Sequence, residues 1–74
     1  MATGDGGPVP TLSARQHQVI ELLAEGLLNK EIAVRLGMSE AGVKKHLSRL
    51  MRDHRVSTRT ALLSAAIRRG EIGL

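Results

Sequence analysis

Residues 29–47 read NKEIAVRLGMSEAGVKKHL and contain the pattern from which the fold can be worked out. Their first half holds a short apolar stripe at helical spacing, which consists of Ile32, Ala33 and Leu36. We expect a short helix here, capped by Asn29 and ended by Gly37. Asparagine can accept hydrogen bonds from the first turn, and glycine readily adopts the left-handed conformation that ends helices.

A second, longer helix is predicted over about residues 40–53. Ser39 is its expected cap, and Glu40 places a negative charge in the first turn, where the helix dipole favours it. The positions expected to face the core are Val43, His46, Leu47 and Leu50. A short helix, a glycine-containing turn and a longer helix are the parts of a helix-turn-helix, whose second helix lies in the major groove of DNA.

One helix is expected before this unit. Ser13 and Gln16 have the spacing of a capping box, and Gly26 is placed to end the helix that they begin. The apolar stripe comprises Val19, Ile20, Leu23 and Leu27, with Leu22 at its margin. Residues 1–10 contain both prolines and several glycines, and they are predicted to be a flexible leader or linker.

A fourth helix is expected over residues 59–69, capped by Thr58 and closed by Gly70. Its core face is predicted to comprise Leu62, Leu63, Ala66 and Ile67. Its outer face is predicted to comprise Ala61, Ser64, Ala65 and Arg68. These mostly small residues would let a second helix approach closely, although small residues are also simply good helix formers. The sequence thus predicts an all-α chain, a compact four-helix domain over residues 11–74.

Composition narrows the function classes. The chain has 74 residues, no aromatic residue and a formal net charge of +4, and residues 29–60 carry eight Lys and Arg against three Asp and Glu. The absence of aromatics argues against modules that stack bases, while the basic middle suits a polyanionic partner. With no cysteine, the chain can have neither a disulfide nor a thiolate metal site. With no apolar run long enough to cross a membrane and no signal pattern, we expect a soluble, unsecreted protein.

Four ordered motifs carry a family resemblance: LSARQ (12–16), GLLNKEIA (26–33), MSEAGVKKHL (38–47) and STRTA (57–61). Together they resemble a LuxR-type (GerE-type) DNA-binding domain over about residues 11–73. The resemblance implies a bacterial transcriptional regulator that binds double-stranded DNA as a homodimer. The third helix would read bases and the fourth would pair the two protomers.

The resemblance also implies a cytoplasmic, nucleoid-associated protein that needs no cofactor or metal, with RNA polymerase as a further partner. Family members, response regulators among them, usually carry a receiver or ligand-sensing domain ahead of this one, and stand-alone members also exist.

Site residues follow from the resemblance position by position. The implied base-reading residues are Lys44, Lys45, Ser48 and Arg49, with Ala41 nearby. The implied phosphate contacts come from Lys30, Ser39, Arg52 and Arg59. The implied dimer interface consists of Ala61, Ser64, Ala65 and Arg68. Lysine can donate to guanine in the major groove, whereas phosphate contacts fix register without reading sequence.

The chain departs from the family pattern at three places. Gly42 replaces the usual Thr in the first turn of the recognition helix, where glycine costs about 1 kcal/mol relative to alanine. Leu28 replaces a Ser or Thr that would form a capping box with Glu31, so Asn29 must take over or the helix start frays. Residues 53–55, Asp-His-Arg, replace the usual Lys-Leu-Gly, which removes a buried leucine and a left-handed glycine. The geometry of that corner is left open.

Two other readings remain beside sequence-specific DNA binding. One is a protein-interaction module that keeps the fold without reading bases, for which Gly42 and the small-residue helix speak. The other is the promoter-binding end of a sigma factor, which the ordered motifs disfavour. An enzyme is the weakest interpretation, because the chain has no metal-ligand spacing and no phosphate-cradling loop. His17, His46 and His54 are interpreted as structural or solvated.

Overall fold

The computed structural model describes residues 12–73, and four helices lie within them. They are α1 (Ala14–Ala24), α2 (Asn29–Leu36), α3 (Glu40–Asp53) and α4 (Arg59–Arg68). The predicted all-α, four-helix fold is confirmed, and the predicted leader of residues 1–10 lies outside the described part. No helix between residues 12 and 73 has the length and apolar character needed to cross a membrane.

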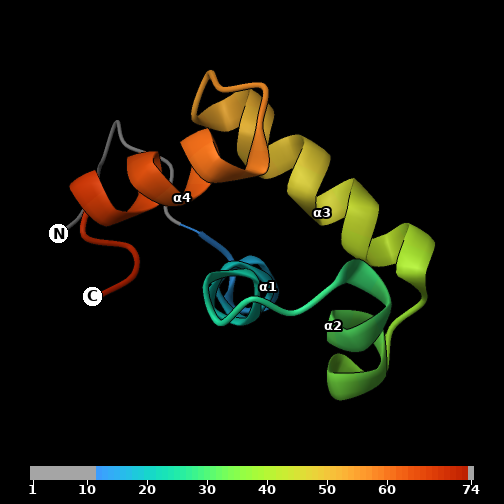
Figure 1. Ribbon diagram of the computed structural model, residues 1–74. Coiled ribbons are helices and arrows are strands. Elements are labelled where there is room, and N and C mark those ends of the chain that lie inside the picture. The colour runs from blue at the N-terminus through green and yellow to red at the C-terminus, as the bar shows by residue number, and fades with distance from the viewer. Residues whose placement is uncertain (1–11, 74) are drawn as a thin grey trace, which may run out of the picture.

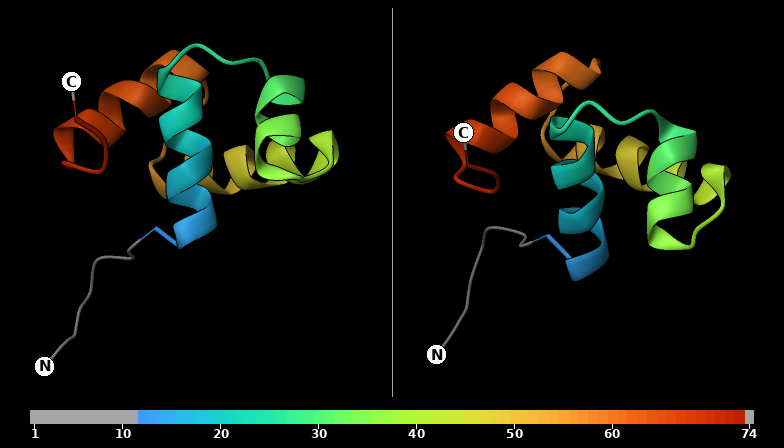
Figure 2. Two further views of the ribbon diagram at one scale, coloured as in Figure 1. Left: turned by 90° about the horizontal axis from the view of Figure 1, so that it is seen from below. Right: turned by 60° about the horizontal axis from the view of Figure 1, so that its bottom comes forward.

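The helices are arranged around α1. In Figure 1, α1 is seen nearly end-on below α3, with α2 under the N-terminal end of α3 and α4 beside its C-terminal end. α1 packs against each of the other three helices, whereas α2 and α4 do not contact each other within the described residues. The two views in Figure 2 agree, because α2 and α4 lie on opposite sides of α1 in both. α3 is therefore supported by α2 near its N-terminal end, by α1 beneath it and by α4 beside its C-terminal end.

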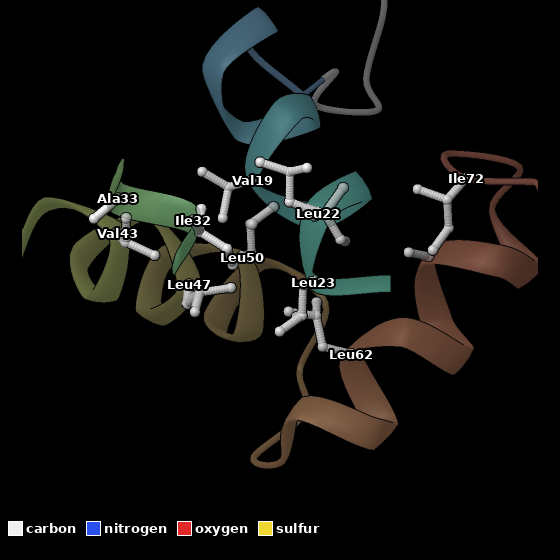
Figure 3. Close-up of a cluster of buried hydrophobic side chains, with 12 residues drawn as sticks. Val19, Leu22, Leu23, Ile32, Ala33, Val43, Leu47, Leu50, Leu62 and Ile72 are labelled. Atoms are coloured by element: carbon white, nitrogen blue, oxygen red, sulfur yellow. The ribbon is translucent and has the colours of Figure 1, made fainter. Parts of the chain in front are cut away.

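The core is a single cluster of aliphatic side chains (Figure 3). Its buried members are Val19, Ile20, Leu22, Leu23, Ile32, Ala33, Val43, Leu47, Leu50, Leu62, Ala66 and Ile72. Most predicted core positions are confirmed. Leu22, expected at the margin, is buried, while Leu27 and Leu36 pack against the cluster only partly buried.

Three of the four helices begin at the expected caps. The side-chain oxygens of Ser13, Ser39 and Thr58 each accept a hydrogen bond from the backbone N–H three residues later, at 3.0–3.1 Å. Ser13 and Gln16 form the complete capping box, because the Gln16 side chain also accepts the Ser13 N–H at 3.1 Å. Each helix is followed by a residue of positive φ: Gly26 (93°), Gly37 (65°), Arg55 (57°) and Gly70 (73°). One of these four residues is not a glycine.

Candidate nucleic-acid interface

The turn between α2 and α3 sets the angle of the candidate recognition helix. Gly37 adopts the left-handed conformation, and the Met38 N–H then donates to the Ala33 carbonyl at 2.9 Å. Two residues later Ser39 caps α3 by accepting from the Gly42 N–H at 3.0 Å. Ala33 is buried, which lets α2 and α3 pack closely. The helix-turn-helix predicted from residues 29–47 is confirmed, with α3 over the predicted residues 40–53.

The start of α2 differs from expectation. Asn29 is the first residue of the helix rather than its cap, and Leu28 occupies the cap position. The leucine side chain cannot accept a hydrogen bond, but the Glu31 carboxylate accepts the Leu28 N–H at 2.7 Å. Half of a capping box is thus retained. The expectation that Asn29 takes over as cap is wrong, because its Oδ1 is buried and has no hydrogen-bond partner among residues 12–73.

α3 presents a basic surface on the side away from the core. Val43, Leu47 and Leu50 are buried and fix the rotation of the helix about its axis. The side chains that this rotation leaves exposed include Lys44, Lys45, Ser48, Arg49 and Arg52. Within residues 12–73, none of these lysines and arginines lies within ion-pair distance of an acidic side chain. Their charge is therefore directed at solvent, where a polyanion can bind.

The predicted phosphate-contacting residues come from three helices and one turn. Lys30 lies on α2, Ser39 in the turn, Arg52 near the end of α3 and Arg59 at the start of α4, and all four are exposed. The Ser39 oxygen already accepts the cap hydrogen bond, which leaves its O–H free to donate to an anion. The helices that carry Lys30 and Arg59 lie at opposite ends of α3, with α2 at its N-terminal end and α4 at its C-terminal end.

α4 is rotated relative to the expected orientation. Leu62, Ala65 and Ala66 are buried, whereas Leu63 and Ile67 are only partly buried. The placement of Ala65 on the outer face is wrong, since only 6% of its surface is exposed in the single chain. The sequence alone does not show which side of α4 is buried, because small or apolar residues occupy every position from 61 to 67. Of the other predicted interface residues, Ser64 and Arg68 are exposed and Ala61 is partly buried.

The corner between α3 and α4 contains two residues with roles that the sequence left open. Arg55 takes the left-handed conformation at φ 57°, and the Val56 N–H donates to the Met51 carbonyl at 2.9 Å. His54 is 8% exposed, and its ring lies where the family pattern has a buried leucine. The sequence does contain a signal for both roles, because His54 and Arg55 stand where the family pattern has a leucine and a glycine.

His46 is partly buried, as expected for a packing residue on α3. Its Nδ1 is buried without a hydrogen-bond partner in the described part of the chain. Arg15, which the sequence did not single out, donates to the Leu36 carbonyl at 3.2 Å and so joins the start of α1 to the end of α2. A cation at a helix C-terminus interacts favourably with the helix dipole.

This geometry defines a helix-turn-helix domain, and the comparisons with known proteins identify its family. The model of bacterial regulatory proteins of the luxR family matches residues 10–66, and the chain belongs to this family. It is a LuxR/GerE-type helix-turn-helix DNA-binding domain of the kind found in transcription regulators, a family that is not a class of enzymes.

Relatives of two lengths match the chain. The spore germination protein GerE of Bacillus subtilis (strain 168) is 37% identical over 65 residues, which cover 88% of each protein. The response regulator Rre1 of Synechocystis sp. is 39% identical over 56 residues, which cover 76% of this chain and 24% of Rre1. The chain thus spans about a quarter of the length of such response regulators.

Solved structures confirm the fold. The structure of the transcription factor GerE superposes with a TM-score of 0.81 at 29% identity, covering 84% of this chain and 92% of GerE. The response regulator ChrA of a heme-sensing two-component system superposes with a TM-score of 0.83 at 38% identity, covering 89% of this chain and 33% of ChrA.

Proposed function

We propose that the chain binds specific sequences of double-stranded DNA with α3 in the major groove and thereby regulates bacterial transcription on the nucleoid. One observation carries this proposal. The exposed side of α3 bears lysines and arginines that are outside ion-pair distance of any acidic side chain in residues 12–73. Buried Val43, Leu47 and Leu50 fix the direction in which this exposed side faces. A recognition helix needs both a polar outer surface and a rigid mounting.

The residues divide into two roles. Lys44, Lys45, Ser48 and Arg49 read base edges, and Lys30, Ser39, Arg52 and Arg59 hold phosphates. Lysine and arginine donate to guanine O6 and N7, whereas phosphate contacts carry no sequence information. The loss of a base-reading residue should therefore change sequence preference, and the loss of a phosphate contact should weaken all sequences alike.

The experiment compares K44A and K45A with K30A and R59A on selected DNA fragments at two salt concentrations. Removal of either recognition-helix lysine should cost about 1–3 kcal/mol and relax base preference. Removal of Lys30 or Arg59 should lower affinity for every fragment and reduce the salt slope by about one unit. Equal, sequence-blind losses in all four variants would overturn the assignment of α3 as the reading helix.

The proposal includes a homodimer on DNA through α4, whose exposed Ser64 and Arg68 and partly buried Ala61 are available to a second copy. Two such domains would read half-sites about one helical turn, roughly 34–36 Å, apart. Selected fragments should then share an inverted repeat of that spacing. A single unrepeated site, bound by one chain, would overturn the dimer but leave the reading helix in place.

A second candidate function is a protein-interaction module, which one observation favours. Val34 on α2 is 83% exposed and borders an open groove whose other lining residues are Glu25, Gly26, Leu27, Lys30, Glu31 and Arg35. An exposed aliphatic side chain beside such a groove suits a protein partner, for which RNA polymerase is the candidate. If V34D abolishes partner binding while DNA selection is absent or uniform, this second function replaces the first.

A further inference from the structure

His54 is enclosed at the junction of α3 with the C-terminal segment. The side chain has no exposed surface, and both of its ring nitrogens have an oxygen partner. Nδ1 lies 2.7 Å from the backbone carbonyl of Leu50, one turn earlier on α3. Nε2 lies 2.6 Å from Oε1 of Glu71, three residues beyond the end of α4. The imidazole thus bridges the end of the recognition helix and the segment that follows α4.

Both partners of this ring are ordinarily acceptors. A backbone carbonyl can only accept, so Nδ1 must carry a hydrogen and donate it to Leu50. An ionised carboxylate can also only accept, so Nε2 must carry a hydrogen as well, which makes the ring an imidazolium. A neutral ring satisfies the geometry only if the Glu71 carboxyl carries the hydrogen and donates it to Nε2. In either arrangement, His54 and Glu71 together carry one proton more than a neutral imidazole beside an ionised carboxylate would carry.

Other charged groups surround the pair. Arg69, just past α4, lies 3.7 Å from the second carboxylate oxygen of Glu71. From α1, His17 Nε2 lies 2.9 Å from the Glu71 backbone carbonyl, and His17 Nδ1 lies 3.7 Å from Glu21. The Arg69 guanidinium favours the ionised carboxylate and so the arrangement in which the ring is the cation. His17 is half-exposed and tied to the backbone, which makes it a second, separable proton site.

We propose that His54 and Glu71 are positioning residues that retain one buried proton between them in the folded protein, and that this proton holds the C-terminal segment, and with it the end of α4, onto α3. When the proton leaves, the Nε2 lone pair faces a carboxylate oxygen at hydrogen-bond distance with no hydrogen between them. The contact then becomes repulsive, and the imidazole has no exposed surface through which water could relieve it. The inference does not depend on DNA binding.

The sign of the pH effect follows from the proton balance. If the folded chain holds a proton that the unfolded chain releases, rising pH must favour unfolding. A histidine in an unfolded chain loses its proton near about pH 6.5, so the loss of stability begins there and continues as the pH rises. Just below that pH the histidine of the unfolded chain is protonated as well, and the contact contributes its full stability.

The test is urea unfolding of the 74-residue chain between about pH 5.5 and about pH 9, with E71Q as the matched variant. Far-UV circular dichroism is the readout, because the chain has no Trp, Tyr or Phe. A glutamine amide can donate to a neutral Nε2 while Nδ1 still donates to Leu50, so E71Q keeps the contact without the extra proton. Relative to E71Q, the unfolding constant of the natural chain should rise by up to about tenfold per pH unit above the onset.

Two further variants locate the proton. H54L places an apolar side chain in the buried position and should remove the slope, as E71Q does. H17Q removes the neighbouring histidine of α1 and should keep the slope. Parallel profiles for the natural chain and E71Q, or a slope that disappears in H17Q instead, would overturn the proposal. Because no DNA is used, a chain that keeps the slope but selects no DNA sequence contradicts the proposed function and leaves this inference intact.

Discussion

The turn before α3 and the corner after it have the same backbone geometry but differ in the side chains that form them. At the first, Gly37 is left-handed and the Met38 N–H reaches back to Ala33. At the second, Arg55 is left-handed and the Val56 N–H reaches back to Met51. Both hydrogen bonds measure 2.9 Å. Gly37 adopts the left-handed conformation without strain, whereas Arg55 adopts it at a cost because it has a Cβ.

The comparison shows that a helix end is specified by more than its left-handed residue. Below the first turn, α2 and α3 are joined by buried aliphatic side chains such as Ile32 and Val43. At the second corner, a buried imidazole with two oxygen partners occupies the position next to Arg55. The stability of apolar packing does not depend on pH, whereas the stability of a buried contact between titratable groups depends on which protons are present. The two corners should therefore respond differently to substitution.

The largest effect is expected in the apolar packing between α2 and α3, beneath the first turn. I32A removes a fully buried side chain of α2 and should lower the free energy of unfolding by about 2–5 kcal/mol, because a cavity is left in the core. V34A, on the same helix but 83% exposed, is the control and should change stability by less than about 0.5 kcal/mol. Urea unfolding followed by circular dichroism measures both, and similar losses would contradict the placement of α2.

The next effect tests the glycine of the first turn. G37A should lower stability by about 1–2 kcal/mol, because alanine is strained at φ 65°. A Cβ there would meet no atom within 4 Å, so the cost is one of backbone conformation and not of collision. Thermal unfolding checks the value, and an unchanged midpoint would show that the turn relaxes out of the left-handed region.

The reverse exchange is predicted at the second corner. R55G should raise stability by about 0.5–1 kcal/mol, because relief of the left-handed strain outweighs the greater entropy of glycine in the unfolded chain. The same thermal measurement applies, with the exposed R49A as a control for the loss of one positive charge. If R55G destabilises the chain, the Arg55 side chain makes a contribution that its exposed position does not reveal.

The smallest effect concerns the first turn of α3. G42A should gain up to about 0.5 kcal/mol, since alanine is the better helix former by about 1 kcal/mol and part of this is lost to crowding. An added Cβ would lie 3.2 Å from the Ser39 hydroxyl oxygen and 3.4 Å from the end of Met38, so the cap must shift slightly. A loss of stability would mean that the cap cannot shift. The change in helix content by circular dichroism distinguishes the two results.

Much of the fold was accessible from local signals. The sequence correctly predicts caps at Ser13, Ser39 and Thr58 and helix-ending glycines at Gly26, Gly37 and Gly70, because each acts on its own helix within a few residues. The predicted cap at Asn29 is wrong, and Glu31 accepts the hydrogen bond at the start of α2 from inside the helix. The basic surface of α3 can be predicted in the same way, because the regularly spaced apolar residues of the helix must face the core and the basic residues then face solvent.

The residues that could not be placed depend on contacts distant in sequence. The sequence does not reveal that Ala65 is buried, because its neighbours on α4 are small or apolar and only packing against α1 and α3 decides the rotation of the helix. The partner of His54 is 17 residues away, and no local pattern links the two.

Local signals are enough to predict the four helices, three of their caps and the helix-turn-helix, because these depend on hydrogen bonds and apolar spacing within one or two turns. Long-range packing sets which side of α4 is buried, how Arg55 closes a helix in place of a glycine, and that His54 meets Glu71. Those outcomes depend on groups brought together by the packing of α1, α3 and the C-terminal segment, and the buried environment created by that packing makes a single shared proton matter.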